Sequence, residues 1–182
     1  MLLYFYQSER KRTRVDTLRL GRTNLTVNKN GFGALPVQRV SLDEGRALLR
    51  RAYEGGVNYF DTARAYSDSE EKLGLALSDV RENIVISTKT ASTTPEGFWA
   101  DLNESLRLLR TDYIDIYQFH NPAFCPRPGD GTGLYEAMLE AKAKGMIRHI
   151  GITNHRLAVA EEAVRSGLYV SLQFPFSYLA SE

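Results

Sequence analysis

Cysteine is nearly absent from this chain, since Cys125 is the only one among 182 residues. A single cysteine cannot form an intramolecular disulfide, so we expect a protein of the reducing cytoplasm. The chain also lacks any apolar run of the length that spans a bilayer, and we expect no membrane segment. No cysteine and histidine spacing suggests a zinc site, so we expect no metal.

The chain carries almost no net charge, because 23 lysines and arginines balance 22 aspartates and glutamates. A charge of +1 gives no field that would attract nucleic acid or an anionic membrane. The local exception is a basic cluster at Arg10, Lys11, Arg12 and Arg14, which we interpret as part of a solvated N-terminal arm, residues 1–14. With 43% apolar residues, the remainder, residues 15–182, is predicted to form one globular unit.

Segments that predict strands alternate with segments that predict helices. Residues 17–20 and 25–27 flank a glycine-containing turn and predict a β-hairpin that covers one end of the fold. Ser41 with Glu44 three residues later is the pattern of a capping box, and Thr94 before Pro95 predicts an N-cap followed by a first-turn proline. The further predicted strands are 31–35, 57–60, 83–88, 113–119, 147–152 and 169–174, and the predicted helices are 41–54, 69–77, 95–109, 134–144 and 156–165.

This alternation predicts an α/β fold in which consecutive strands lie side by side and parallel, with helices outside. Such a sheet is either open or closed into a barrel. An open sheet would bind its ligand beside a glycine-rich phosphate loop. The nearest candidate, residues 31–36, has a proline where the third glycine is needed, and no Walker loop is present. We therefore predict a parallel (β/α)8 barrel of the TIM type, of which about the first six βα units are present.

Four polar side chains of different chemistry stand out: Asp61, Tyr66, Lys89 and His120. Asp61, Lys89 and His120 each follow a predicted strand, and the carboxyl ends of parallel strands meet at the barrel rim that carries the chemistry. Taken singly, each has an ordinary structural interpretation as a turn-capping aspartate, a packed tyrosine, a surface lysine or a structural histidine. Their joint occurrence favours a catalytic site.

Reduction of a carbonyl group is a reaction that this combination of side chains can serve. A hydride comes from one side and a proton must reach the developing alkoxide from the other. A tyrosine phenol can give the proton, but its ordinary pKa of about 10 makes it a weak acid near neutral pH. We expect the Lys89 ammonium to lower the pKa of Tyr66 while Asp61 holds that ammonium in place. His120 is expected to donate a hydrogen bond that orients the substrate oxygen.

In their sequence context these residues make the chain resemble the aldo-keto reductase family, from about residue 17 to residue 179. The run from Gly56 to Ala63, then Tyr66, then the run from Glu71 to Gly74 is similar to the family's first signature. Residues 151–154 and Gln173 are similar to the segments that hold the nicotinamide carboxamide in the family. The resemblance implies reduction of aldehydes and ketones to alcohols by NADPH.

The resemblance also implies a role for each site residue. Tyr66 would be the proton donor, Asp61 and Lys89 its modulators and His120 the substrate orienter. For Asn154, a helix N-cap role is the alternative to cofactor binding. NADH stays an alternative to NADPH, and the identity of the small carbonyl substrate is not implied. The residues implied to bind the cofactor are Gly33, Ala34, Asp61, Thr153, Asn154 and Gln173.

Family members continue through two more strands, which this sequence does not contain. The unpaired first and last strands of a six-strand arc would favour self-association. Three explanations are open: a piece of a longer enzyme, which we favour, a barrel completed by a partner chain, or a short form without catalysis. A different function is a non-catalytic binding or regulatory subunit that keeps the reductase fold. The presence of all four candidate catalytic residues, Asp61, Tyr66, Lys89 and His120, speaks against that alternative.

Overall fold

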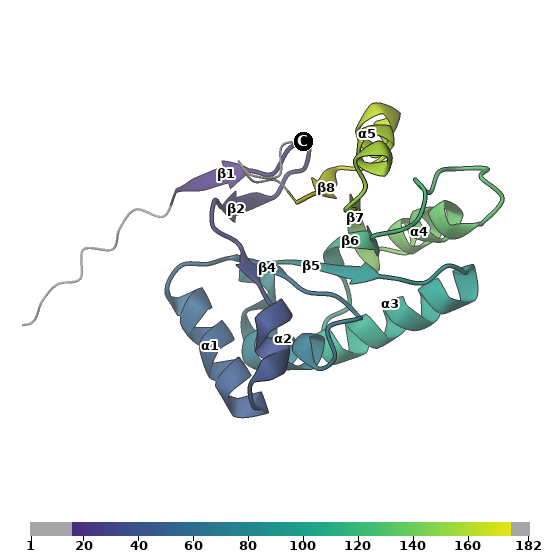
Figure 1. The fold of residues 1–182 in the computed structure, drawn as a ribbon. Coiled ribbons are helices and arrows are strands. Elements are labelled where there is room, and N and C mark those ends of the chain that lie inside the picture. The colour runs from purple at the N-terminus through teal and green to yellow at the C-terminus, as the bar shows by residue number, and fades with distance from the viewer. Residues whose placement is uncertain (1–15, 176–182) are drawn as a thin grey trace, which may run out of the picture.

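The computed structural model of the chain describes residues 16–175. Its main feature is a curved sheet of six parallel strands, each paired with the strand that follows it in the sequence (Figure 1). This half-barrel confirms the predicted fold class, whereas the predicted arm, residues 1–14, lies outside the described residues. The strands are β3 (Phe32–Gly33), β4 (Tyr59–Asp61), β5 (Val85–Thr90), β6 (Ile114–His120), β7 (Ile147–Thr153) and β8 (Ser171–Gln173).

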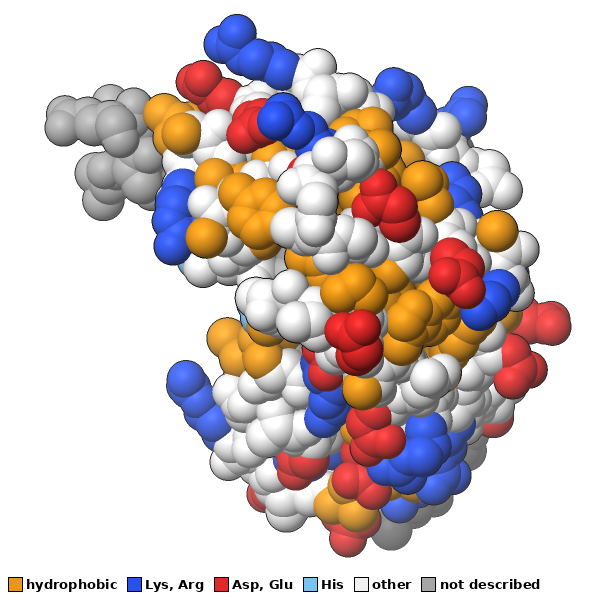
Figure 2. Space-filling view, turned by 90° about the vertical axis from the view of Figure 1, so that its right-hand side faces the viewer, with side chains coloured by type: hydrophobic (Ala, Val, Ile, Leu, Met, Phe, Trp, Pro, Cys, Tyr) orange, Lys and Arg blue, Asp and Glu red, His pale blue; other side chains and the backbone are white. Residues whose placement is uncertain are grey.

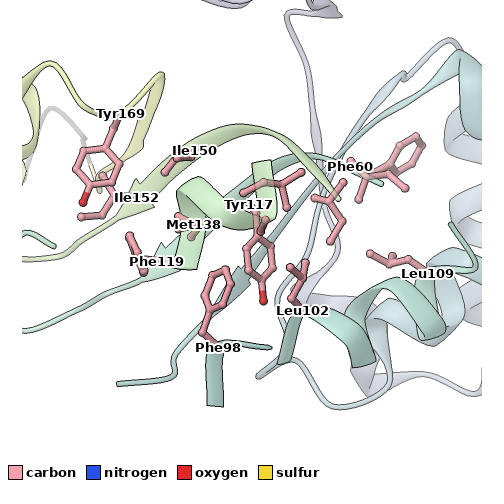
Figure 3. Close-up of a cluster of buried hydrophobic side chains, with 14 of the residues drawn as sticks. Phe60, Phe98, Leu102, Leu109, Tyr117, Phe119, Met138, Ile150, Ile152 and Tyr169 are labelled. Carbon is pink, nitrogen blue, oxygen red and sulfur yellow. The ribbon is translucent and has the colours of Figure 1, made fainter. Parts of the chain in front are cut away.

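The helices pack on the outer face of the sheet. Between helices and sheet lies the main apolar core, in which Phe60, Phe98, Leu102 and Tyr117 are fully buried (Figure 3). The α-helices are α1 (Leu42–Glu54), α2 (Ser69–Leu77), α3 (Pro95–Leu109), α4 (Leu134–Ala143) and α5 (Leu157–Ser166), and two short 3-10 helices are η1 (Leu35–Arg39) and η2 (Ser78–Asn83).

Two of the predicted helices begin with the capping hydrogen bonds that the sequence indicated. The Ser41 hydroxyl accepts from the backbone of Glu44, and the Glu44 side chain accepts from the backbone of Ser41, which completes the capping box. The Thr94 hydroxyl accepts from the backbone nitrogen of Gly97 at 3.2 Å. Both helices therefore begin where local chemistry satisfies their first free N–H groups.

The predicted strand 31–35 is too long, because Leu35 already begins η1. Pro36 lies in the first turn of η1, where a missing N–H costs no hydrogen bond. At its other end, the buried Lys72 ammonium donates to the carbonyl oxygens of Val37 and Val40, both at 2.8 Å. A side chain from α2 thus fixes this turn, and the local sequence gives no signal of that.

The predicted hairpin is confirmed as β1 (Thr17–Arg19) and β2 (Thr26–Asn28), which pair antiparallel. It lies at the amino end of the strands, where Leu25 and Val27 form a second apolar cluster with Val85 and Ile116. The hairpin therefore covers one end of the half-barrel and leaves the carboxyl end of the strands free.

Candidate active site

The carboxyl end of the sheet brings three of the four predicted catalytic residues to one rim. Asp61 and His120 are the last residues of β4 and β6, and Lys89 lies one residue before the end of β5. The parallel register aligns these strands, with Asp61 opposite Ser87 and Lys89 opposite Gln118. Figure 2 shows the molecule from the side toward which the arrow of β5 points in Figure 1, and the surface is indented at the left of that view.

Lys89 and Asp61 form a close ion pair. The Lys89 ammonium lies 2.6 Å from Asp61 Oδ2 and donates to the carbonyl oxygen of Thr62, also at 2.6 Å. The lysine side chain is 2% exposed. Burial lowers the pKa of Lys89 from its ordinary value, and the adjacent Asp61 carboxylate partly opposes that shift.

The loop after β4 positions Tyr66 above this pair. The backbone nitrogens of Thr62 and Arg64 donate to the carbonyl oxygens of Ser87 and Lys89, at 2.9 and 3.0 Å, so the loop follows β5 beyond the end of β4. The Lys89 ammonium lies 5.1 Å from the centroid of the Tyr66 ring. The rings of Tyr66 and His120 meet edge to face, with centroids 5.7 Å apart. The structure thus brings all four predicted residues together.

The same loop is anchored from behind by α2. Arg64 forms an ion pair with Glu70, which is fully buried and also accepts a hydrogen bond from Thr88 at 2.6 Å. The hydroxyls of Thr62 and Ser69 lie 2.8 Å apart. These contacts fix the path of the loop, and so the place of the phenol.

The electrostatics of the phenol differ from our expectation. Burial raises the pKa of Tyr66 and the charge of Asp61 raises it further, whereas we expected Lys89 to lower it. The physical reason is that Asp61 neutralises the ammonium at 2.6 Å, so the pair presents little net positive charge to the ring. Burial and the Lys89 charge lower the pKa of His120, which keeps its imidazole neutral near neutral pH.

Asp61 is held by three further side chains, of which the sequence analysis named Gln173 as a cofactor residue and missed Ser87 and Gln118. Its Oδ1 accepts from Ser87 Oγ at 2.5 Å, from Gln173 Nε2 at 2.8 Å and from Gln118 Nε2 at 3.3 Å. Ser87 lies two residues before Lys89 and Gln118 two before His120, and residues two apart share a face of a strand. That alternation was the available signal for both.

Some of the residues expected to bind a cofactor are open to a ligand, and others are buried and already hydrogen-bonded within the protein. Gly33 is exposed, and a Cβ there would meet nothing within 4 Å, so its face is open. Ala34 is fully buried, with its backbone nitrogen donating to the backbone carbonyl oxygen of Asp61 and its own carbonyl oxygen accepting from the Ser69 hydroxyl. Asn154 is 1% exposed.

Asn154 has both amide atoms engaged within the protein. Its Nδ2 donates to the Pro122 oxygen at 2.8 Å and its Oδ1 accepts from the Arg156 nitrogen at 2.8 Å. The structure gives it no N-cap role either, because the N-cap of α5 is Arg156.

Two of the expected cofactor residues retain free hydrogen-bonding capacity. Gln173 uses Nε2 on Asp61 and lies beside the Tyr59 hydroxyl, and its Oε1, with two lone pairs, can accept a further hydrogen bond. The Thr153 hydroxyl accepts from Asn121 at 3.1 Å and still has a proton to donate. A carboxamide needs one acceptor for its NH2 group and one donor for its oxygen, so the chemistry of these two side chains fits a nicotinamide carboxamide.

Within residues 16–175, no group of three or more histidine, cysteine, aspartate or glutamate side chains is placed to hold a metal ion. In the same part of the chain, no helix has the length and apolar character needed to cross a bilayer.

Comparison with known proteins identifies the same family over most of the chain. A family model described as "Aldo/keto reductase family" matches residues 28–181. An uncharacterized oxidoreductase of Bacillus subtilis, YqkF, is 31% identical over 173 residues, which are 87% of this chain and 55% of that protein. The methylglyoxal reductase DkgB of Salmonella typhi is 34% identical over 148 residues, 77% of this chain and 52% of the relative.

A plant relative and a solved structure show similarity to the same family. The L-galactose dehydrogenase of Arabidopsis thaliana is 32% identical over 157 residues, covering 78% of this chain and 49% of its own. The holo form of an aldo-keto reductase from Bacillus halodurans superposes with a TM-score of 0.79 at 29% identity, over 90% of this chain and 58% of that one. The chain spans about half the length of the curated relatives it matches.

Proposed function

Because this chain belongs to the aldo-keto reductase family, we propose that it supplies the catalytic half of a carbonyl reductase. The reaction is reduction of an aldehyde or ketone to an alcohol, with a hydride from a reduced nicotinamide cofactor and a proton from Tyr66. The observation that supports this most is the convergence of Tyr66, His120 and the Lys89–Asp61 pair at one rim of the sheet.

Each side chain has a separate task in this proposal. The raised pKa of Tyr66 keeps its phenol protonated, so a proton is available for the oxygen of the substrate. His120 is neutral because its pKa is lowered, and its N–H can hold the carbonyl oxygen beside the phenol. Lys89 lies 5.1 Å from the centroid of the Tyr66 ring and, paired with Asp61, is the proposed modulator of the phenol.

The cofactor is proposed to be NADPH, with NADH as the alternative. When bound, the dihydronicotinamide supplies the hydride. Gly33 offers an open face, and Gln173 Oε1 and the Thr153 hydroxyl are the proposed contacts for the carboxamide. Ala34 and Asn154 are weaker candidates, because the one is buried and the amide of the other is already used. Asp61 would act through Lys89.

Small aldehydes are the proposed substrate class. Among the relatives, one is named a methylglyoxal reductase and another an L-galactose dehydrogenase, which act on a small oxoaldehyde and a sugar by name. The half-exposed Phe124, in the loop after β6, is proposed to face the substrate. Methylglyoxal and nitrobenzaldehyde are therefore suitable first probes.

The test combines binding and turnover. Calorimetric titration of NADPH into the chain is expected to show binding, and NADPH absorbance should fall when methylglyoxal is added. Loss of turnover with retained binding in the Tyr66→Phe variant would support the proton-donor role. NADPH binding without turnover of any aldehyde in the unaltered chain would favour the non-catalytic subunit. Absence of both would mean that this chain alone does not perform the reaction.

Two further expectations stay proposals. A cytoplasmic location is supported by the single cysteine, Cys125, which is buried and unpaired. Self-association is supported by β3 and β8, each of which has only one strand neighbour within the described sheet. Sedimentation at several protein concentrations tests the second.

A further inference from the structure

The Asp61 carboxylate receives more hydrogen bonds than its ion pair with Lys89 requires. Lys89 occupies Oδ2, whereas the amide nitrogens of Gln118 and Gln173 both reach Oδ1, at 3.3 and 2.8 Å. Gln173 lies 112 residues beyond Asp61 in the chain. Three distant segments of the sequence thus meet at one oxygen atom.

The contact follows from the construction of the half-barrel. Asp61, Gln118 and Gln173 lie on β4, β6 and β8, which are alternate strands of the sheet. In barrels of this type, inward side chains from alternate strands meet in a shared layer. Side chains from β6 and β8 can therefore reach across β5 and β7 to a residue on β4.

The orientation of both amides is set by chemistry. An ionised carboxylate only accepts hydrogen bonds, so the NH2 group of each glutamine must face Asp61. Gln118 is 1% exposed, and its Oε1 has no hydrogen-bond partner within the described residues. A buried amide that leaves its oxygen unsatisfied while its nitrogen meets Asp61 has this contact as its main polar interaction.

We infer that Gln118 and Gln173 are positioning residues, which hold Asp61 so that Oδ2 faces the Lys89 ammonium. Without these two donors only Ser87 Oγ, at 2.5 Å, still holds Oδ1, and the carboxylate is less constrained against rotation away from the lysine. Lys89 would then lose its main compensation for burial and would release its proton more easily. The contribution of this role to catalysis rests on the proposed reductase function, whereas the positioning of Asp61 does not.

Four titratable groups surround Lys89 and must be kept constant in a test. Asp61 and His120 approach it along the rim, Tyr66 lies above it, and Glu70 of α2 acts on it from behind the sheet. None of these groups is changed by substitutions at positions 118 and 173, so an altered titration of Lys89 reports on the amide contacts.

The experiment is an NMR titration of the lysine ε-carbon signals in the cofactor-free chain, with the Lys89 signal assigned from its loss in Lys89→Met. Gln173→Met keeps the length of the side chain and removes the donor. At a given pH we expect the ratio of neutral to charged Lys89 to rise about tenfold, the scale of one lost charge-assisted hydrogen bond. Gln118→Met should act in the same direction and more weakly, because its contact is longer.

Ser171→Ala is the matched control. Ser171 lies on β8 two residues before Gln173, and its buried hydroxyl has no partner within the described residues. Its replacement should leave the Lys89 titration unchanged. If Gln173→Met does not fold, Gln118→Met provides the same comparison.

An unchanged titration in the two methionine variants would overturn the inference. A shift toward charged lysine would overturn it as well, because the amides would then only weaken the field of Asp61. The titration uses no cofactor and no substrate. Its result therefore stands even if the unaltered chain shows no reductase activity.

Discussion

Each end of the sheet contains an aspartate that is paired with a cationic side chain beside a tyrosine ring, but the cation differs between the two ends. At the carboxyl end, Asp61 pairs with Lys89, and Tyr66 lies over the ammonium. At the amino end, Asp115 pairs with Arg81 at 2.7 Å and with Arg148 at 3.0 Å. The carbon atoms of these two guanidinium groups lie 4.0 and 3.7 Å from the centroid of the Tyr113 ring.

The two ends differ in whether their cation can change its protonation state. An arginine keeps its proton in proteins, so the Asp115 cluster can only hold structure together. A lysine can change its protonation state, and burial already lowers the pKa of Lys89. The hairpin and η2 cover the amino end, and within the described residues neither of them covers the carboxyl end, where barrels of this type carry their chemistry.

The largest expected effect separates the two tyrosines. In a form of the protein that reduces aldehydes, Tyr66→Phe should lower turnover by about two to four powers of ten, the scale of general acid catalysis. Tyr113→Phe keeps its ring between the arginines and should leave turnover unchanged. The measurement is NADPH consumption with methylglyoxal. Equal turnover in the two variants would contradict the assignment of Tyr66 as proton donor.

A second effect separates the two aspartates by stability. Asp115→Asn leaves the buried Arg81 charge without its partner and should lower the free energy of unfolding by about 3–5 kcal/mol. Asp61→Asn should cost less, about 1–3 kcal/mol, because Lys89 can release its proton. Urea denaturation of the cofactor-free chain measures both values. If the two losses were the same, the contrast between lysine and arginine would have no energetic basis.

A smaller effect concerns the outer arginine of the amino-end cluster. The side chain of Arg148 is 49% exposed, and ion pairs of that kind contribute about 0–1 kcal/mol. Arg148→Met should therefore change the urea midpoint only slightly, while Arg81→Met should lower it clearly, since Arg81 is 8% exposed. A large loss in the Arg148 variant would show that both arginines are structural.

The smallest effect is on the acid side of the stability curve. Burial lowers the pKa of His120 at one end and of His149 at the other, from an ordinary value of 6.5. Below that value the unfolded chain binds more protons than the folded one, so stability is complete above pH 6.5 and falls as the pH passes through the lowered values. Melting temperatures measured down to about pH 5 should fall less in His120→Gln and His149→Gln than in the unaltered chain. Parallel curves would contradict these shifts.

Local sequence patterns were sufficient for most of the fold. The capping box at Ser41 and the proline start at Pro95 locate two helices, because caps depend on neighbouring residues alone. The strand before Pro36 was predicted too long, because the turn that replaces its end is held by Lys72 from another helix. Predictions were accurate where the stabilising contact is local and less accurate where it comes from elsewhere in the chain.

The sequence by itself determined the alternation of strands and helices, the parallel order of the strands and the four residues of the candidate site. These depend on short-range periodicity and on the rule that parallel strands end at one rim. Only the tertiary structure decided that Gln118 and Gln173 hold Asp61, that Asn154 is engaged within the protein and that the pKa of Tyr66 is raised rather than lowered. The physical reason is that burial and hydrogen-bond partners are set by residues far apart in the chain.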